Sequence, residues 1–165
     1  MAAFATGRRE AAHVAPRVAA LVRAFEEVAA TRMAGLPVMH PQLRVEAVGF
    51  ARDEDGLGGV LITPWFMNLV CLPDGGDALA VGAARERRVG GEAFGFIGAE
   101  MPGVGRFEAC SLCSPMFHFA DQDAARATAQ AVLDLLRKSG TAAEAPAMPS
   151  RRALFLGRAG AGRAP

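Results

Sequence analysis

Two cysteines spaced as a C-x-x-C pair, Cys110 and Cys113, carry the most obvious chemical potential in the sequence. Thiolates at this spacing can bind zinc or iron, or cycle as a dithiol. A structural zinc site needs four ligands, yet there is no second C-x-x-C and no H-x-x-x-H motif. Redox pairs begin a helix, whereas this pair lies in a strand-like run. We therefore predict free, buried cysteines and no cofactor, and we keep a small metal-binding or redox protein as the alternative.

Histidine-based and phosphate-binding chemistry has little support. His13, His40 and His118 are scattered, and only the fold could bring the last two to Cys71 to complete a metal site. The chain lacks the G-x-S-x-G, Walker, G-x-G-x-x-G and H-E-x-x-H motifs. The glycine-rich segment 53–59 lacks the Lys and Ser/Thr that hold phosphate and magnesium. We predict that the protein is not an enzyme.

Composition and charge limit the kind of protein that this chain can be. The chain has 165 residues, of which 52% are hydrophobic and 21% charged, so it can form one globular domain with a real core. A net charge of +1 gives no long-range attraction to nucleic acid. Glu10 and His13 interrupt the region behind Arg8 and Arg9, and the apolar run 58–73 is broken by polar residues and proline. We predict a cytoplasmic protein that is not integrated in a membrane.

The spacing of apolar residues predicts the elements that would position any site. Apolar residues recur every three or four positions in two segments, 16–34 and 122–138, which predicts two helices. We expect Pro16 in the first turn of the first helix and Asp121 as the N-cap of the second. Strand-like runs lie between them, at 43–50, 59–63, 66–72, 92–97 and 106–112, with 83–91 as a solvated connection or an edge strand. We predict an α+β domain over residues 1–138, in which an N-terminal helix and a C-terminal helix pack on one face of a mixed or antiparallel sheet. Residues 139–165 read as a flexible tail.

Two proline-containing bends present methionine and aromatic residues. Pro64 cannot donate to a sheet ladder, so segment 63–68 should break a strand and expose its side chains at a bend. Segment 114–119 repeats this design around Pro115. Such residues either fill the core or form an adaptable apolar groove for a peptide helix. The candidate groove residues are Trp65, Phe66, Met67, Met116, Phe117 and Phe119.

Four segments together resemble the HybE family, whose relatives are called HupJ and HoxT. They are RMAGLP (32–37), LRVEAVGF (43–50), GVLITPWFMNLVCLP (59–73) and SLCSPM (111–116). The resemblance covers about residues 17–136 and departs at Cys113, where the pattern has an aromatic residue, so the C-x-x-C pair looks like an incidental substitution. Members of this family are accessory proteins of nickel–iron hydrogenase maturation.

The resemblance implies a chaperone that binds the hydrogenase small-subunit precursor through its twin-arginine signal peptide, before export. Other maturation factors or the large subunit are further possible partners. An apolar groove with carboxylates at one end would suit such a peptide, and Glu100, Glu108 and Asp121 are the candidate carboxylates.

The tail itself contains a sequence similar to a twin-arginine signal. Its segment SRRALFL includes Ser150, Arg151, Arg152, Leu154, Phe155 and Leu156. We hypothesise that this segment is a pseudo-ligand that occupies the protein's own groove, with a solvated arginine-rich tail as the alternative.

Overall fold

The computed structural model describes residues 11–141, with side chains from 16 to 139. Two long helices enclose six strands and one short 3-10 turn. In chain order these are α1 (Ala11–Ala30), β1 (Glu46–Asp53), β2 (Gly56–Ile62), β3 (Met67–Pro73), η1 (Gly75–Asp77), β4 (Ala84–Val89), β5 (Glu92–Met101), β6 (Gly105–Cys113) and α2 (Gln122–Thr141). Within this part of the chain, no helix is long and apolar enough to span a membrane.

The six strands form one sheet in the order β1-β2-β3-β6-β5-β4. Every neighbouring pair is antiparallel, so the sheet consists of two three-stranded meanders that join where β3 pairs with β6. The predicted α+β class with an antiparallel sheet is confirmed. Segment 83–91, for which two alternatives were open, contains the edge strand β4.

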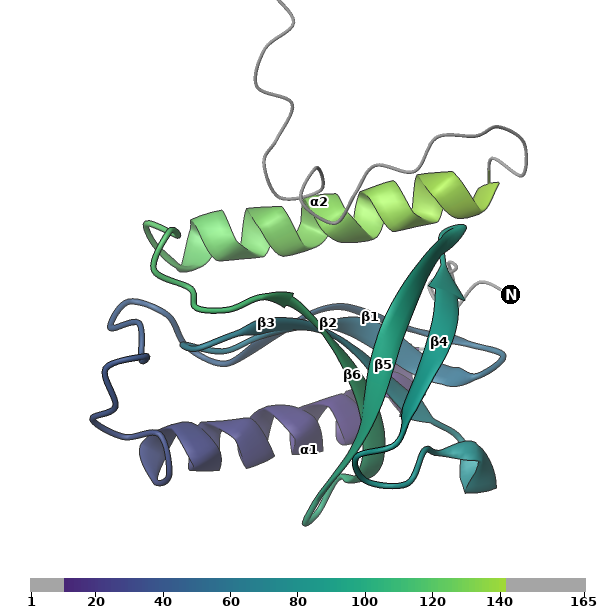
Figure 1. Cartoon of the computed structure of the whole chain (residues 1–165), viewed down its shortest axis with the longest axis horizontal. Helices are drawn as coiled ribbons and strands as arrows, with labels where there is room; N and C mark the ends of the chain where they lie inside the picture. The colour runs from purple at the N-terminus through teal and green to yellow at the C-terminus, as the bar shows by residue number, and fades with distance from the viewer. Residues whose placement is uncertain (1–10, 142–165) are drawn as a thin grey trace, which may run out of the picture.

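The two helices cover opposite faces of the sheet, as Figure 1 shows, and not one face as predicted. α1 buries Leu21 and Phe25 against one face. α2 buries its apolar stripe, including Leu133, against the other. The physical reason lies in the central strands: every residue of β2 is buried, and alternate side chains point to opposite faces. A strand that is apolar on both sides needs cover on both sides.

The start of α2 agrees with prediction, its end at Thr141 lies beyond the predicted 138, and α1 differs from prediction at both ends. The Asp121 carboxylate accepts a 2.8 Å hydrogen bond from the Ala124 amide, which confirms the predicted N-cap. α1 already begins at Ala11, so Pro16 lies inside the helix and not in its first turn. Alanines at 11, 12 and 15 favour helix ahead of the proline.

Candidate functional site

The pairing of β3 with β6 brings the two aromatic bends together at one end of the sheet. Met67 at the start of β3 lies opposite Cys113 at the end of β6. The bend before β3 (63–66) and the loop after β6 (114–121) are therefore neighbours, and the Ser114 hydroxyl donates a 3.1 Å hydrogen bond to the Trp65 carbonyl. Two segments that lie about fifty positions apart in the sequence thus form one structural unit.

Thr63 fixes the first bend. Its hydroxyl oxygen accepts hydrogen bonds from the amides of Trp65 (3.3 Å) and Phe66 (3.0 Å). Its own amide donates to the Phe66 carbonyl at 2.8 Å. Pro64 supplies the fixed φ angle that suits a tight turn. The bend is therefore held by the hydrogen bonds of a buried threonine as well as by the proline that the sequence pointed to.

A third segment, residues 31–45, is tied to both bends by His40. The His40 amide donates to the Pro64 carbonyl at 2.9 Å, and its Nε2 lies 2.9 Å from the Phe119 carbonyl. Its Nδ1 accepts a 3.1 Å hydrogen bond from the Gln42 amide. Because Nδ1 is an acceptor, the ring proton is assigned to Nε2, which donates to the Phe119 carbonyl. The ring stacks on Phe117, with centroids 5.9 Å apart. Sequence reasoning considered His40 only as a metal ligand and missed this structural role.

The predicted groove residues divide into core and surface. Three of them, Met67, Met116 and Phe119, are buried in the core under α2. Trp65 and Phe66 are partly buried and pack against Phe25 of α1, while Phe117 is 53% exposed. We call Trp65, Phe66 and Phe117 the loop-end surface. These three are the predicted groove residues that a partner can reach.

Glu108 cannot serve as the predicted receptor for a partner's arginine. Its side chain is completely buried in the middle of β6 and already binds two arginines of β4. Arg85 Nη2 lies 2.7 Å from Oε1, and Arg87 Nε lies 2.6 Å from Oε2. Segment 83–91 was predicted as a solvated connection or an edge strand, and it contains the edge strand β4. Arg85 and Arg87 are two residues apart in this strand, so both point to the same face as Glu108.

The pKa of Glu108 reflects these neighbours. Burial alone would raise it, but the hydrogen bond from Arg87 and the charges of Arg87 and Arg85 outweigh burial and hold the pKa below its ordinary value. The carboxylate therefore stays ionised at neutral pH inside the protein. This makes Glu108 an internal anchor between the two strands.

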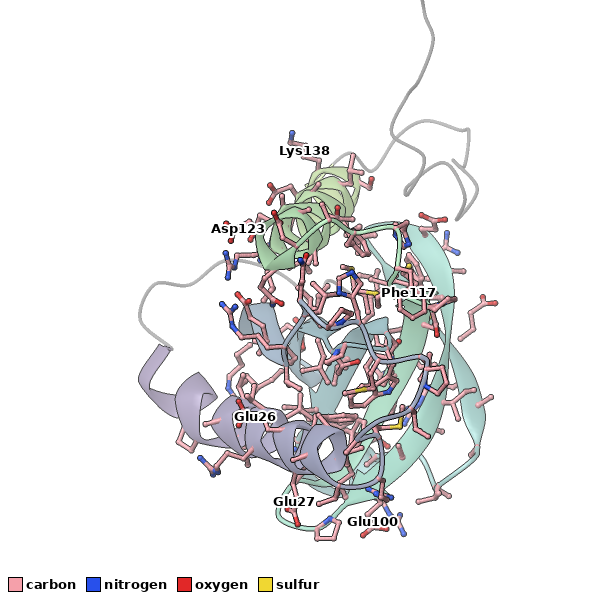
Figure 2. All side chains as sticks on the ribbon, turned by 90° about the vertical axis from the view of Figure 1, so that its left-hand side faces the viewer. Glu26, Glu27, Glu100, Phe117, Asp123 and Lys138 are labelled. Atoms are coloured by element: carbon pink, nitrogen blue, oxygen red, sulfur yellow. The ribbon has the colours of Figure 1, made fainter. Side chains whose placement is uncertain are left out.

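The other two predicted carboxylates are exposed but lie in different places. Glu100 faces Arg106 at 3.9 Å. Figure 2 shows Glu100 near Glu27 at the α1 side of the molecule, well separated from Phe117. Asp121 begins α2 directly after the loop that carries Phe117, and only its Oδ1 is used in capping the helix. Asp121 is thus the predicted carboxylate that lies close in the chain to the loop-end surface.

The three cysteines form no disulfide, and they differ in burial. Cys110 and Cys71 are buried in the core, and burial raises the pKa of Cys71 to about 11. Cys113 is partly buried, and its Sγ lies 3.5 Å from His118 Nε2. Burial also raises the pKa of Cys113, which disfavours its thiolate. Among residues 16–139, no three His, Cys, Asp or Glu side chains are grouped so that they could hold a metal ion.

The hypothetical pseudo-ligand, Ser150 to Leu156, lies outside the described residues. The predicted tail, 139–165, lies almost entirely outside them as well.

Comparison with known proteins gives a consistent result. A family model described as NiFe-hydrogenase assembly, chaperone, HybE matches residues 16–157. The chain is 46% identical to the protein HoxT of Cupriavidus necator over 162 residues, covering 86% of this chain and 89% of the relative. It is 31% identical to the hydrogenase-2 operon protein HybE of Escherichia coli (strain K12) over 140 residues, covering 82% and 85%. The solution structure of HybE from Escherichia coli shares the fold, with a TM-score of 0.59 at 24% identity, over 81% of this chain and 85% of that one.

Proposed function

Because the chain belongs to the HybE family of nickel–iron hydrogenase assembly chaperones, we propose that it binds the hydrogenase small-subunit precursor through a twin-arginine signal peptide. Binding takes place in the cytoplasm, before the precursor is exported. The observation that supports this most is the assembly of two aromatic bends and a third loop at one end of the sheet, with Phe117 presented to solvent.

The chemistry of the ligand fits this end of the molecule. A twin-arginine signal offers an apolar helical stretch preceded by two arginines. Phe117, Trp65 and Phe66 supply an apolar contact area, and aromatic side chains bind apolar segments with little loss of conformational entropy. The free oxygen of Asp121 can receive a guanidinium group beside them. The apolar stretch would then contact the bend 63–66 and the loop 114–121, and the arginines would contact the end of that loop.

The first test is calorimetric titration of the protein with a peptide of a hydrogenase small-subunit signal. We expect micromolar or tighter binding, and a clear loss of affinity when Arg-Arg is replaced by Lys-Lys, because the lysine ammonium lacks the planar set of N–H donors of a guanidinium. Absence of binding to either peptide would refute signal recognition and would leave the folded subunit, the large subunit or another maturation factor as the partner.

Phe117→Ser tests where the peptide binds. Phe117 is more than half exposed, so its loss should weaken binding about ten-fold or more while stability changes little. Leu135→Ser is the matched control, because Leu135 is 44% exposed on α2 and outside the loop-end surface. Equal affinities for the two variants would rule out the loop-end surface as the binding site, even if the wild-type protein binds the peptide.

The pseudo-ligand segment is a separate proposal. If Ser150 to Leu156 compete for the same surface, removing residues 150–165 should tighten peptide binding. Unchanged or weaker binding would refute competition.

A further inference from the structure

The two edges of the sheet are protected to different degrees. The edge strand β1 has an irregular register between Val48 and Ala51, and both helices contact it. The edge strand β4 pairs with β5 from Ala84 to Val89 without any shift in register. In the strand order β4 is the last strand, and β5 is its only neighbour in the sheet among the described residues. A regular edge strand offers a row of backbone donors and acceptors to another strand.

The side chains of β4 divide by face. Arg85 and Arg87 point to the face that carries Glu108, which binds both of them. Ala84, Glu86 and Arg88 alternate with them and are exposed on the opposite face. Glu86 has no ion pair with any residue of 16–139, and the Arg88 guanidinium donates only to the Gly91 carbonyl, at 3.0 Å. An acidic and a basic side chain therefore stand next to each other on an open edge.

We propose that β4 pairs antiparallel with β4 of a second copy of this chain, about a two-fold axis at Arg87. In this register Glu86 lies opposite Arg88 of the second copy, and the symmetry repeats the pair. Opposite charges directly across two antiparallel strands are stabilising, and like charges are destabilising. A two-fold axis one residue earlier would instead place Glu86 opposite Glu86. The charge pattern of β4 thus selects one register.

The main objection to this pairing is repulsion between the two copies of Arg87, and acidic residues of each chain reduce it. The axis places Arg87 next to Arg87 of the second copy, which would repel if both charges were unbalanced. Arg87 is however bound to Glu108 and lies 3.5 Å from Asp55, so its charge is compensated within its own chain. The outermost pairs within β4 in the same register join Arg85 to Val89 of the second copy.

A contact of this kind is small, so the dimer should be weak and depend on concentration. The two sheets would become one continuous sheet of two copies. β4 lies at the opposite side of the sheet from the loops 31–45 and 114–121 in Figure 1, so the pairing does not depend on the proposed function and leaves the loop-end surface free.

Sedimentation of the full chain, at concentrations from about 10 μM to 1 mM, tests the proposal. We expect a reversible monomer–dimer equilibrium. Glu86→Arg and Arg88→Glu, made separately, should each raise the dissociation constant about ten-fold or more, because each change creates two like-charge pairs. The double variant Glu86→Arg/Arg88→Glu should restore the wild-type constant, since it exchanges the charges and keeps both pairs.

Glu26→Arg is the control, because it makes the same change at an exposed glutamate of α1. The double variant has the wild-type composition of the strand, so it keeps the test decisive if a single variant folds poorly. A wild-type chain that stays monomeric up to about 1 mM overturns the proposal. So do single variants that dimerise like the wild-type, or a folded double variant that remains monomeric.

Discussion

Replacing Glu108 by glutamine should destabilise the protein far more than the same change at an exposed glutamate. Glutamine keeps the shape of the side chain but removes the charge that two arginines share. Glutamine keeps one neutral acceptor oxygen, so it weakens the contacts with Arg85 at 2.7 Å and with Arg87 at 2.6 and 3.2 Å without removing all of them. One amide N–H group would also face a guanidinium N–H, which is a contact between two donors.

The magnitude follows from the burial of the partners. Breaking a fully buried ion pair costs about 3–5 kcal/mol. The side chains of Arg85 and Arg87 are 31% and 15% exposed, so solvent recovers part of this loss. We expect the free energy of unfolding to fall by about 2–4 kcal/mol, and the melting temperature by about 10 °C. Combined with Arg87→Gln, the total loss should be smaller than the sum of the single losses.

Urea unfolding is the assay, followed by circular dichroism and by the fluorescence of Trp65, the only tryptophan. Glu100→Gln is the control, because Glu100 is 54% exposed and 3.9 Å from Arg106, and it should cost less than about 0.5 kcal/mol.

The folded pKa of Glu108 is lowered, so its contribution to stability is present above the unfolded pKa and is lost as the pH falls through the folded pKa. The difference between the wild-type and Glu108→Gln should therefore shrink below about pH 4. Equal losses for the two glutamine variants would refute the role of Glu108 as an internal anchor.

Two further substitutions probe close contacts. His40→Ala removes the hydrogen bond to the Phe119 carbonyl and should lower the free energy of unfolding by about 1–3 kcal/mol in the same assay; no loss would show that the third loop is held by other contacts. Gly90→Ala would place a Cβ 2.0 Å from the Leu136 carbonyl oxygen, at a positive φ, and should cost about 3 kcal/mol or more. Gly75→Ala, also at a positive φ but with open space around the Cβ, should cost only about 1 kcal/mol, and a similar loss at both glycines would argue against the contact with α2.

Local patterns in the sequence predict most of the elements. The strand-like and helix-like periodicities place five of the six strands and both helices, and Asp121 is predicted as a cap because capping depends on neighbouring residues alone. The placement of α1 and α2 on opposite faces also has a sequence signal, which is the unbroken apolar character of β2. That signal predicts a strand buried on both faces, and such a strand needs a helix on each side.

The candidate site was harder to predict because its contacts are non-local. Met116 and Phe117 are both large apolar residues at adjacent positions, yet Met116 is fully buried and Phe117 is exposed. Met116 packs in the core under α2, whereas Phe117 stacks on His40, which comes from another loop. Glu108 shows the same limit, since its arginines are more than twenty positions away and only the sheet register places them on one face.

The joining of the two meanders has a consequence for how the chain folds. Each meander can form from hairpins that are close in sequence, whereas the β3–β6 contact joins residues about forty positions apart, so its loop-closure cost is larger. Both aromatic bends lie at this junction, and Ser114 and Trp65 meet only once it has closed. A chain with two formed halves but no junction would lack the loop-end surface. Binding of a client at this surface would then require that the chaperone itself has first paired β3 with β6.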